Sequence, residues 1–280
     1  MITDVDFSNI KFKMCIPHSS IHNNYFGGNV QSEILYNKVW AKDETQIMNK
    51  ILSKKKGKVI DVGANTGYFT FIGLIHNCPV IAIEPNKIHT QYFNKTIEIN
   101  NFSKDNILHL ECFVSIKQEK CSFDGWTGND KLLLTSISPT VMVDTVSLDS
   151  ICDECLFLKI DVEGNEPDVI KSARRLLENE KINYIMFEIT YIINNKVDNE
   201  NIEMLNMLKK YGFTLYEIIP NILNEITNIT NKVNQWEYEY FNCHQKANPS
   251  ITCGGTNILA IHNKSENIFT KTNNIHQFYI

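Results

Sequence analysis

Short runs of apolar and β-branched residues alternate along the chain with segments whose apolar residues recur at helical spacing. The strand-like runs are 59–62, 80–83, 107–114, 156–162, 184–189, 214–218 and 258–261. The helix-like segments among them are 66–76, 87–100 and 167–178. Strands that are buried on both faces read as continuous apolar runs, which parallel sheets covered by helices require. The pattern therefore predicts a doubly wound α/β fold.

The order of elements changes after Glu188. A helix-like segment, 203–210, is followed by the strand-like run 214–218, a long Asn-rich connection and the last strand-like run. This order fits a reversed final strand that completes the sheet. Because the chain shows no internal repeat and no Gly/Ser-rich linker, we expect one domain over residues 44–280, with insertions near 116–147 and 220–255. Residues 1–43 are expected to form an N-terminal segment or cap, and loops at strand ends are expected to set substrate choice.

Composition narrows the class of protein. With 43% hydrophobic residues, 280 residues are enough for a sizeable core. The sequence contains no apolar run of membrane-spanning length and no signal-peptide pattern, so we expect a soluble, cytoplasmic protein that does not enter a membrane. A net charge of -5 makes a nucleic-acid partner unlikely. The eight cysteines are scattered, so reduced thiols are expected. The oligomeric state is left open.

The stretch "DVGANTG" at the end of the first predicted strand indicates a ligand site. Gly63 and Gly67 allow a tight turn and leave space for a ligand close to the backbone. Their spacing differs from the Gly-x-Gly-x-x-Gly fingerprint of dinucleotide sites. The next strand ends in Glu84, where an acid can accept hydrogen bonds from two ribose hydroxyls. These features together predict a site for S-adenosylmethionine, with the adenine near 111–113. The predicted cofactor-binding residues are Asp61, Gly63, Asn65, Gly67, Tyr68, Glu84, Asn86 and Cys112.

Five motifs carry a family resemblance. In chain order they are "VIDVGANTGYFT", "VIAIEPN", "VSLDSI", "LKIDVEGNEPDVI" and "IMFEI". They resemble the FkbM-type family of S-adenosylmethionine-dependent methyltransferases over roughly residues 44–190. The resemblance implies a seven-stranded, mostly parallel sheet with the final strand antiparallel. It also implies methyl transfer to an oxygen, typically a hydroxyl of a sugar, a glycan or a small natural product, but it specifies no acceptor.

Candidate catalytic residues stand at the ends of the fourth and fifth predicted strands. A hydroxyl is a poor nucleophile until its proton is being removed, so a carboxylate or a cation is needed beside it. Asp161, Glu163 and Glu188 are the candidates. Asp161 and Glu188 could hold Mg²⁺ between them, or one acid could be a general base while another anchors the amino group of the cofactor. Glu163 could instead cap the following helix. Lys159 is two positions before Asp161 and should share its face of the sheet.

Other features have weaker implications. Trp126, in the polar loop "DGWTGND", is a candidate platform for stacking a sugar or an apolar ring, or else a lid on the core. Cys152 and Cys155 have the spacing of half a zinc site, although core packing is the simpler interpretation. The sequence therefore predicts an O-methyltransferase for a hydroxylated glycan or small molecule. RNA ribose 2′-O-methylation and a non-catalytic cofactor-binding module are the alternatives.

Overall fold

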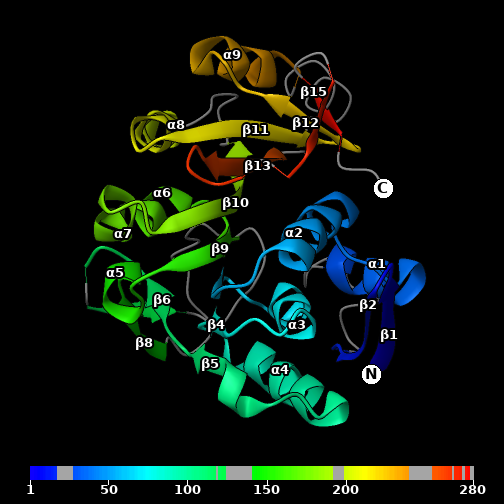
Figure 1. Ribbon diagram of the computed structural model, residues 1–280. Coiled ribbons are helices and arrows are strands. Elements are labelled where there is room, and N and C mark those ends of the chain that lie inside the picture. Colours follow the sequence, from blue (N-terminus) through cyan, green and yellow to red (C-terminus); the bar gives the residue numbers. More distant parts are fainter. Residues whose placement is uncertain are drawn as a thin grey trace.

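The computed structural model describes residues 1–17, 28–117, 119–123, 141–191, 199–239, 254–266, 268–272 and 275–277. In this part of the chain, ten strands form one mixed sheet (Figure 1) in the order β14-β15-β12-β11-β13-β10-β9-β3-β4-β5. Their bounds are β3 Val59–Val62, β4 Val80–Ile83, β5 Ile107–Leu110, β9 Cys155–Ile160, β10 Ile182–Tyr191, β11 Phe213–Ile219, β12 Ile222–Glu225, β13 Gly254–His262, β14 Thr270–Thr272 and β15 Ile275–Gln277.

The seven predicted strands lie side by side in this sheet and confirm the fold class. β5, β4, β3, β9 and β10 pair in parallel, and β13 is antiparallel to both of its neighbours, β10 and β11. The chain runs from β3 outward to β5 and returns to β9 beside β3. In such sheets, ligands bind outside the carboxyl ends of the strands at this point of reversal.

Three further strands extend the sheet beyond β11. β12 pairs antiparallel with β11, and β15 and β14 follow it. β12 lies inside the connection that the sequence left without a pattern. Its sequence "ILNE" is too short and too polar to stand out as a strand, and it is held by the tight turn at Asn221, where φ is 68°.

Helices cover both faces of the sheet (Figure 1). α1 to α4 lie on one face, whose core includes Ile34, Ile47, Phe71 and Phe93. α5 to α9 lie on the other face, where Trp236 of α9 is fully buried. The bounds are α1 Gly28–Asn37, α2 Lys42–Lys54, α3 Tyr68–Ile75, α4 Lys87–Asn100, α5 Leu148–Ile151, α6 Glu166–Lys171, α7 Arg174–Glu178, α8 Asn199–Lys210 and α9 Ile229–Glu239. None of the helices in the described ranges is both long and apolar enough to cross a membrane.

Two predicted elements are interrupted. The strand expected over 107–114 ends at Leu110, and Phe113–Val114 forms β6, which pairs with β8 (Val141–Val146) in a separate sheet that also contains β7 (Lys120–Phe123). The helix expected over 167–178 is divided into α6 and α7 near Ser172. The Ser172 hydroxyl donates to Val169 O at 2.7 Å and accepts from Leu148 N at 3.2 Å, and such local bonds compete with helical ones.

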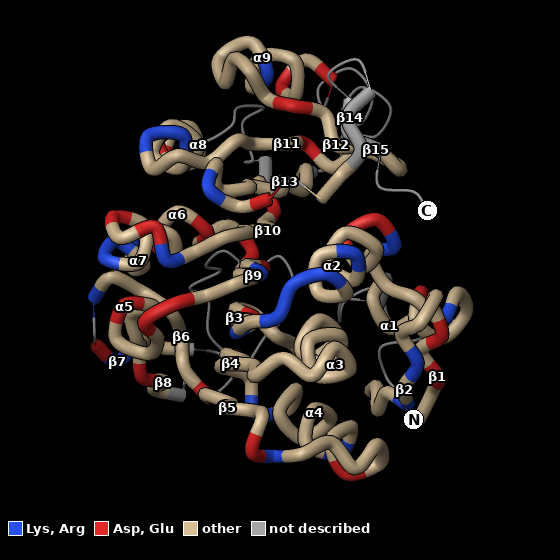
Figure 2. Tube along the Cα trace, in the orientation of Figure 1, with Lys and Arg blue, Asp and Glu red and all other residues tan. Residues whose placement is uncertain are grey.

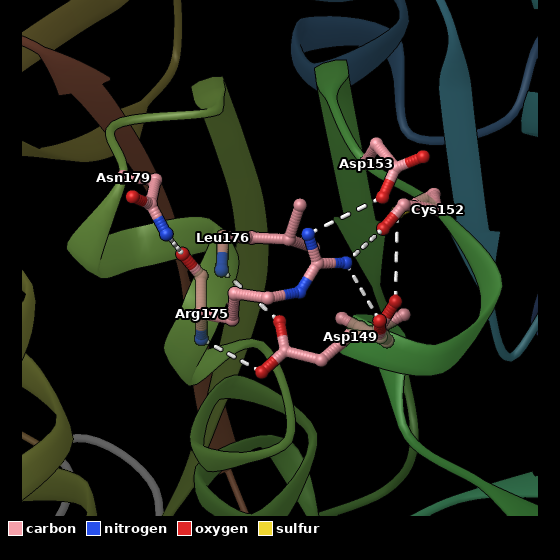
Figure 3. A network of polar contacts seen from close by, with 7 residues as sticks. Asp149, Cys152, Asp153, Arg175, Leu176 and Asn179 are labelled. Atoms are coloured by element: carbon pink, nitrogen blue, oxygen red, sulfur yellow. Dashed lines mark hydrogen bonds and ion pairs between the residues drawn. The ribbon is translucent and has the colours of Figure 1, made fainter.

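The motif "VSLDSI" has a structural role at the amino ends of β9 and β10 (Figure 3). The Asp149 carboxylate of α5 accepts from Arg175 N and Leu176 N at the start of α7. In return, the Arg175 guanidinium donates to Asp149 O and Cys152 O at the end of α5. The two helix ends thus satisfy each other's unpaired backbone groups. This network lies at the sheet edge opposite the carboxyl ends of the strands.

The N-terminal residues contribute to the core. β1 (Ile2–Phe7) and β2 (Ile10–Cys15) form a hairpin whose apolar side packs in the same cluster as α3 and α4. Cys15 N donates to Thr96 Oγ1 of α4 at 2.9 Å, and Asn100 Nδ2 donates to Lys13 O. The proposed boundary after residue 43 and a substrate-facing role for this segment stay predictions.

Most of the lysines in the connection between α2 and β3 (Figure 2) have protein partners. Lys55 pairs with Glu266 at 2.6 Å, while Lys56 Nζ donates to Leu52 O and His76 O. The connection leads to the amino end of β3, so these lysines lie away from the edge where ligands bind.

Gly63 is required where β3 and β9 approach each other. Its φ is +79°, and a Cβ at this position would lie 1.8 Å from the backbone oxygen of Asp161. Asp161 N in turn donates to Val62 O at 2.9 Å. A side chain at Gly63 would therefore force the ends of the two strands apart.

We expect Gly63→Ala to lower the free energy of unfolding by about 3 kcal/mol or more, because strain from positive φ adds to a backbone clash. Gly212 is the matched control, since its φ is +84° but a Cβ there would meet only the His262 ring, at 3.2 Å. Gly212→Ala should cost about 1–2 kcal/mol, the cost of the positive φ alone. Urea unfolding of both variants measures the difference, and equal losses would contradict the clash.

Candidate active site

The alternation of side chains along three parallel strands places the charged residues on one face of the sheet. Asp61 of β3 is directly opposite Lys159 of β9, and Lys159 is opposite Met186 of β10. Met186 belongs to the core on the α1–α4 side, so its neighbours in this row also face those helices. Asp161, directly after β9, and Glu188 of β10 lie two residues beyond Lys159 and Met186, just past the point where β9 and β10 stop pairing.

The turn after β3 is built from backbone bonds. Gly63 N and Ala64 N both donate to Ile83 O of β4, at 2.9 and 3.0 Å. Asn65 has a φ of 50°, and its N donates to the Glu84 carboxylate at 2.8 Å. The structure gives a further reason for the glycines: at Gly67, where φ is +95°, a Cβ would meet the Phe71 and Phe93 rings at 2.6 Å. Contacts within the protein therefore already require both glycines. Close approach of a ligand to this turn stays a prediction.

Glu84 is held at the end of β4 by both of its oxygens. Oε2 accepts from Asn65 N, and Oε1 accepts from Asn86 N at 2.9 Å. Asn86 also caps α4, because its side chain accepts from Ile88 N at 2.8 Å. A carboxylate offers about four acceptor positions, so two remain for a ligand. This arrangement suits the two hydroxyls of a ribose.

Asp61 is buried beneath the turn. Its Oδ2 accepts from the Thr70 hydroxyl of α3 at 2.6 Å. Burial raises the pKa of Asp61 to about 6, and the Thr70 bond and the Lys159 charge only partly offset this effect. The residue is only 2% exposed. From its position beneath the turn, the Asp61 carboxyl interacts electrostatically with Lys159.

Lys159 is a buried ammonium surrounded by acids. The residue is 3% exposed, and its Nζ lies 3.3 Å from Asp161 Oδ2 and 5.3 Å from the centre of the Phe69 ring. Burial alone would lower the pKa of Lys159, but Asp161, Asp61 and Glu44 raise it above its ordinary value. Lys159 thus stays charged, and the expectation that it shares a face with Asp161 is confirmed.

Among the described residues, several acids lie near Lys159 at the carboxyl ends of β9 and β10. Burial, then Asp161 and Glu163, raise the pKa of Glu188 to about 7. The pKa of Glu163 is also raised to about 7, by desolvation of its carboxyl and by Asp161 and Glu166, although the residue lies at the surface. Asp161 is partly exposed, with 36% of its side chain accessible to solvent. The structure therefore brings the three predicted catalytic acids into one electrostatic group.

Glu166 and Glu44 are functional candidates that sequence reasoning missed. Glu166 is fully buried, and its Oε1 accepts from Val162 N and Gly164 N, both at 3.1 Å. Glu166 therefore stabilises the "DVEGNE" turn at the start of α6, whereas the sequence analysis considered Glu163 as the cap of that helix. The position of Glu166, an acid in the first turn of a helix, was the sequence feature that could have indicated this role. Glu44 in the first turn of α2 interacts with Lys159 and Asp161, and burial raises its pKa. Nothing in the sequence indicates that α2 approaches β9.

Gly255 makes room for Glu188. A Cβ at Gly255 of β13 would lie 1.8 Å from Glu188 Oε1, so the carboxylate lies across the bare backbone of the neighbouring strand. The two consecutive glycines at 254–255 were the available sequence signal.

The remaining predicted cofactor residues are in less direct positions. The Tyr68 hydroxyl accepts from Trp40 N at 3.1 Å and lies 3.2 Å from Thr45 Oγ1, which anchors the start of α2. Cys112 is buried after β5, and burial raises the pKa of its thiol to about 11. Trp126, the predicted substrate platform, lies outside the described residues. Cofactor binding by Tyr68 and Cys112 stays a prediction.

Metal ligation receives no support from the structure. Within the described ranges, no group of three or more His, Cys, Asp or Glu side chains is placed to hold a metal ion. The Mg²⁺ site suggested for Asp161 and Glu188 is therefore not supported. Cys152 and Cys155 are buried, and their thiols are directed to Leu148 O and Lys58 O. Burial raises the pKa of both thiols, as expected for unreactive core cysteines.

Comparison with protein families identifies the domain that carries this site. The family described as "Methyltransferase FkbM domain" matches residues 61–215, which is more than half of the 280-residue chain. The chain belongs to the FkbM methyltransferase family. The match spans β3 to β11, and so includes the turn after β3, Glu84 and the acids at the ends of β9 and β10. Membership makes this protein an S-adenosylmethionine-dependent methyltransferase.

Solved methyltransferase structures share low similarity with this FkbM protein. Precorrin-6y C5,15-methyltransferase from Geobacter metallireducens GS-15 is 9% identical, with a TM-score of 0.41, over 85% of this chain and 97% of the other. TYW2 from P. horikoshii in complex with MeSAdo is 11% identical, with a TM-score of 0.45, over 93% of this chain and 71% of the other. Similarity of this size carries no argument about substrate. No curated protein matches the chain.

We expect Asp61→Asn to stabilise the FkbM protein at pH 8 but not at pH 4. The pKa of Asp61 is raised to about 6 in the folded state, so its contribution to stability is full below the unfolded value and is lost as pH rises through 6. At pH 8, removing the buried charge should add about 1–3 kcal/mol to the free energy of unfolding. Thermal and urea unfolding at both pH values measure this. The exposed Asp105→Asn is the control, and an Asp61→Asn protein that is less stable than the wild type at pH 8 would contradict the expectation.

Proposed function

We propose that this protein transfers a methyl group from S-adenosylmethionine to a hydroxyl oxygen of a glycan, a sugar or a small natural product. The observation that carries the proposal is the pair Asp161 and Glu188 at adjacent strand ends, where the pKa of Glu188 is about 7. A proton acceptor works best when its pKa is near the working pH. The pair therefore suits removal of a hydroxyl proton at neutral pH.

The residues at the other end of the site fit the cofactor. The Glu84 carboxylate keeps two acceptor positions for ribose hydroxyls, as described above. The turn from Gly63 to Gly67, with Asn65 and Asn86 beside Glu84, would surround the nucleoside and the methionine part. Excess negative charge at the ends of β9 and β10 suits a ligand that carries a cationic sulfonium. When bound, the cofactor supplies an electrophilic methyl group.

The chain's own residues would position the acceptor and take its proton. Positioning a nucleophile at near-attack distance can itself supply on the order of 7–11 kcal/mol of the barrier reduction. Lys159 holds one oxygen of Asp161, which leaves the other oxygen available to orient an acceptor hydroxyl. Glu188, with Glu163 nearby, would accept the proton as the oxygen attacks.

The RNA alternative has less support. A Lys-Asp-Lys-Glu arrangement needs two lysines around the acids. In the described part of the chain, Lys159 is the one lysine whose charge acts on both Glu163 and Glu188. A net charge of -5 also gives no general attraction to RNA. Hydroxylated small molecules and glycans therefore remain the favoured acceptors.

Calorimetric titration of the purified protein with S-adenosylmethionine and S-adenosylhomocysteine tests the cofactor. We expect micromolar binding, and Glu84→Ala should weaken it by about 10- to 100-fold, because hydrogen bonds to an ionised group are lost. Asp161→Asn and Glu188→Gln should keep cofactor affinity within about threefold. The same two variants should abolish methyl transfer in a screen of glycan and sugar-nucleotide acceptors with radiolabelled donor, because the acceptor's proton can no longer be taken.

The exposed acid Glu98, which pairs with Lys95 on the surface of α4, provides the control. Glu98→Gln should behave as the wild type in both assays. If Asp161→Asn and Glu188→Gln transferred methyl groups normally, the chemistry would not lie at these strand ends. If the wild-type protein bound neither cofactor form, the proposal as a whole would fail.

A further inference from the structure

Two of the buried side-chain nitrogens that lack a hydrogen-bond partner in the described residues belong to imidazoles close to Glu84. They are His89 Nδ1 and His109 Nε2. Buried polar atoms are nearly always paired, so an unpaired one calls for a functional or structural reason. His89 is 8% exposed, and its Nδ1 lies 3.5 Å from Glu84 Oε1.

His89 occupies the protein side of the Glu84 carboxylate. The two backbone donors, Asn65 N and Asn86 N, come from the turn after β3 and from the start of α4. His89 lies in the first turn of α4 and approaches Oε1 from a third direction. Because Nδ1 is enclosed by protein atoms, it acts on Glu84 rather than on a ligand.

Packing of Phe93 fixes the orientation of α4, the helix that carries His89. Phe93 is one helical turn after His89 and is fully buried. Its ring lies 5.1 Å from that of Phe71 and stacks on the His109 ring at 4.3 Å, with 19° between the planes. The helix is also closed at its start by the Asn86 cap. α4 therefore cannot easily rotate His89 away from Glu84.

We propose that His89 is a positioning residue for recognition of the ribose diol, acting through Glu84. This inference rests on the proposed function, since it takes the ligand to be a nucleoside with two vicinal hydroxyls. His89 Nδ1 lies 3.5 Å from Oε1, a contact longer than a normal hydrogen bond, and it would limit how far the carboxylate can turn. The acceptor positions of Glu84 that Asn65 N and Asn86 N leave open would then accept the two hydroxyls.

The test measures selection for the diol, because a merely structural residue would not affect it. Wild-type protein is titrated with S-adenosylhomocysteine and with its 2′-deoxy and 3′-deoxy analogues. His89→Phe keeps a ring but removes the donor, and it should reduce the preference for the full diol by about tenfold. His89→Asn places an amide N–H near the position of Nδ1 and should restore most of the preference.

Glu84→Gln provides a coupling test. If His89 acts through Glu84, adding His89→Phe to Glu84→Gln should produce no further loss of selection. His76→Phe is the matched control. His76 is also a buried histidine, and its Nε2 is hydrogen-bonded to Asn49 Oδ1 at 2.7 Å, but it lies at the opposite edge of the sheet from Glu84. It should lower the melting temperature and leave selection unchanged.

The outcomes separate this inference from the proposed function. Wild-type protein that selects the diol, together with His89→Phe that selects it equally well, would overturn the role of His89 while the function stands. An equal loss of affinity of His89→Phe for S-adenosylhomocysteine and for both deoxy analogues would also overturn the role of His89, because that pattern indicates general damage to the binding site. Failure of the wild type to bind any analogue would overturn the proposed function itself. If His89→Phe does not fold, the diol preference of His89→Asn is measured with and without Glu84→Gln. This comparison then decides whether His89 acts through Glu84.

Discussion

The site depends on the register of β3, β9 and β10. Side chains alternate along a strand, so a slip by one residue would turn every charged group to the opposite face. In the observed register, Lys159 is opposite Asp61 and contacts Asp161. Its buried ammonium group therefore interacts with an acid of β3 and with the acid that follows β9. Gly63 permits this register, because only a residue without a side chain allows the end of β3 to approach the Asp161 backbone. The position of the acids is thus a consequence of strand packing.

The same packing buries several carboxyls of the site. Burial first, and neighbouring carboxylates second, raise the pKa values of Asp61, Glu163 and Glu188, and Lys159 only partly offsets these effects. Raised carboxyl pKa values mean that the folded state is less stable at neutral pH than it would be with neutral side chains. Proteins commonly accept such a cost at sites that bind or react, where local rules of stability are broken. The burial of polar groups here is therefore better explained by ligand chemistry than by folding.

The sequence predicted the centre of the molecule better than its margins. The strands at 59–62 and 80–83 and the helix at 87–100 match to the residue, because continuous apolar runs and apolar residues at helical spacing are local signals. The acids at strand ends could be read in the same way. The hairpin of β1 and β2, together with β12 and α9, gains its stability from distant partners, which no local pattern reveals. Glu44 was missed for the same reason, since only the tertiary fold brings α2 to Lys159. At Gly67 the structure adds a requirement that the sequence did not reveal, because a Cβ there would meet the Phe71 and Phe93 rings.

The two ends of the site are built on different physical principles. On the β4 side of β3, Glu84 is held by backbone N–H groups and enclosed by α4, so its geometry is fixed before any ligand arrives. On the β9 side, the pKa values of Glu163 and Glu188 are raised to about 7, chiefly by burial, so these two carboxyls change protonation near neutral pH. A rigid end suits recognition of a constant ligand, whereas a titrating end suits a reaction that releases a proton. The two ends are separated at β3, where the order of strands in the sheet reverses: β4 lies on one side of β3 and β9 on the other. Changes at one end should therefore alter binding without altering chemistry, and the converse should hold at the other.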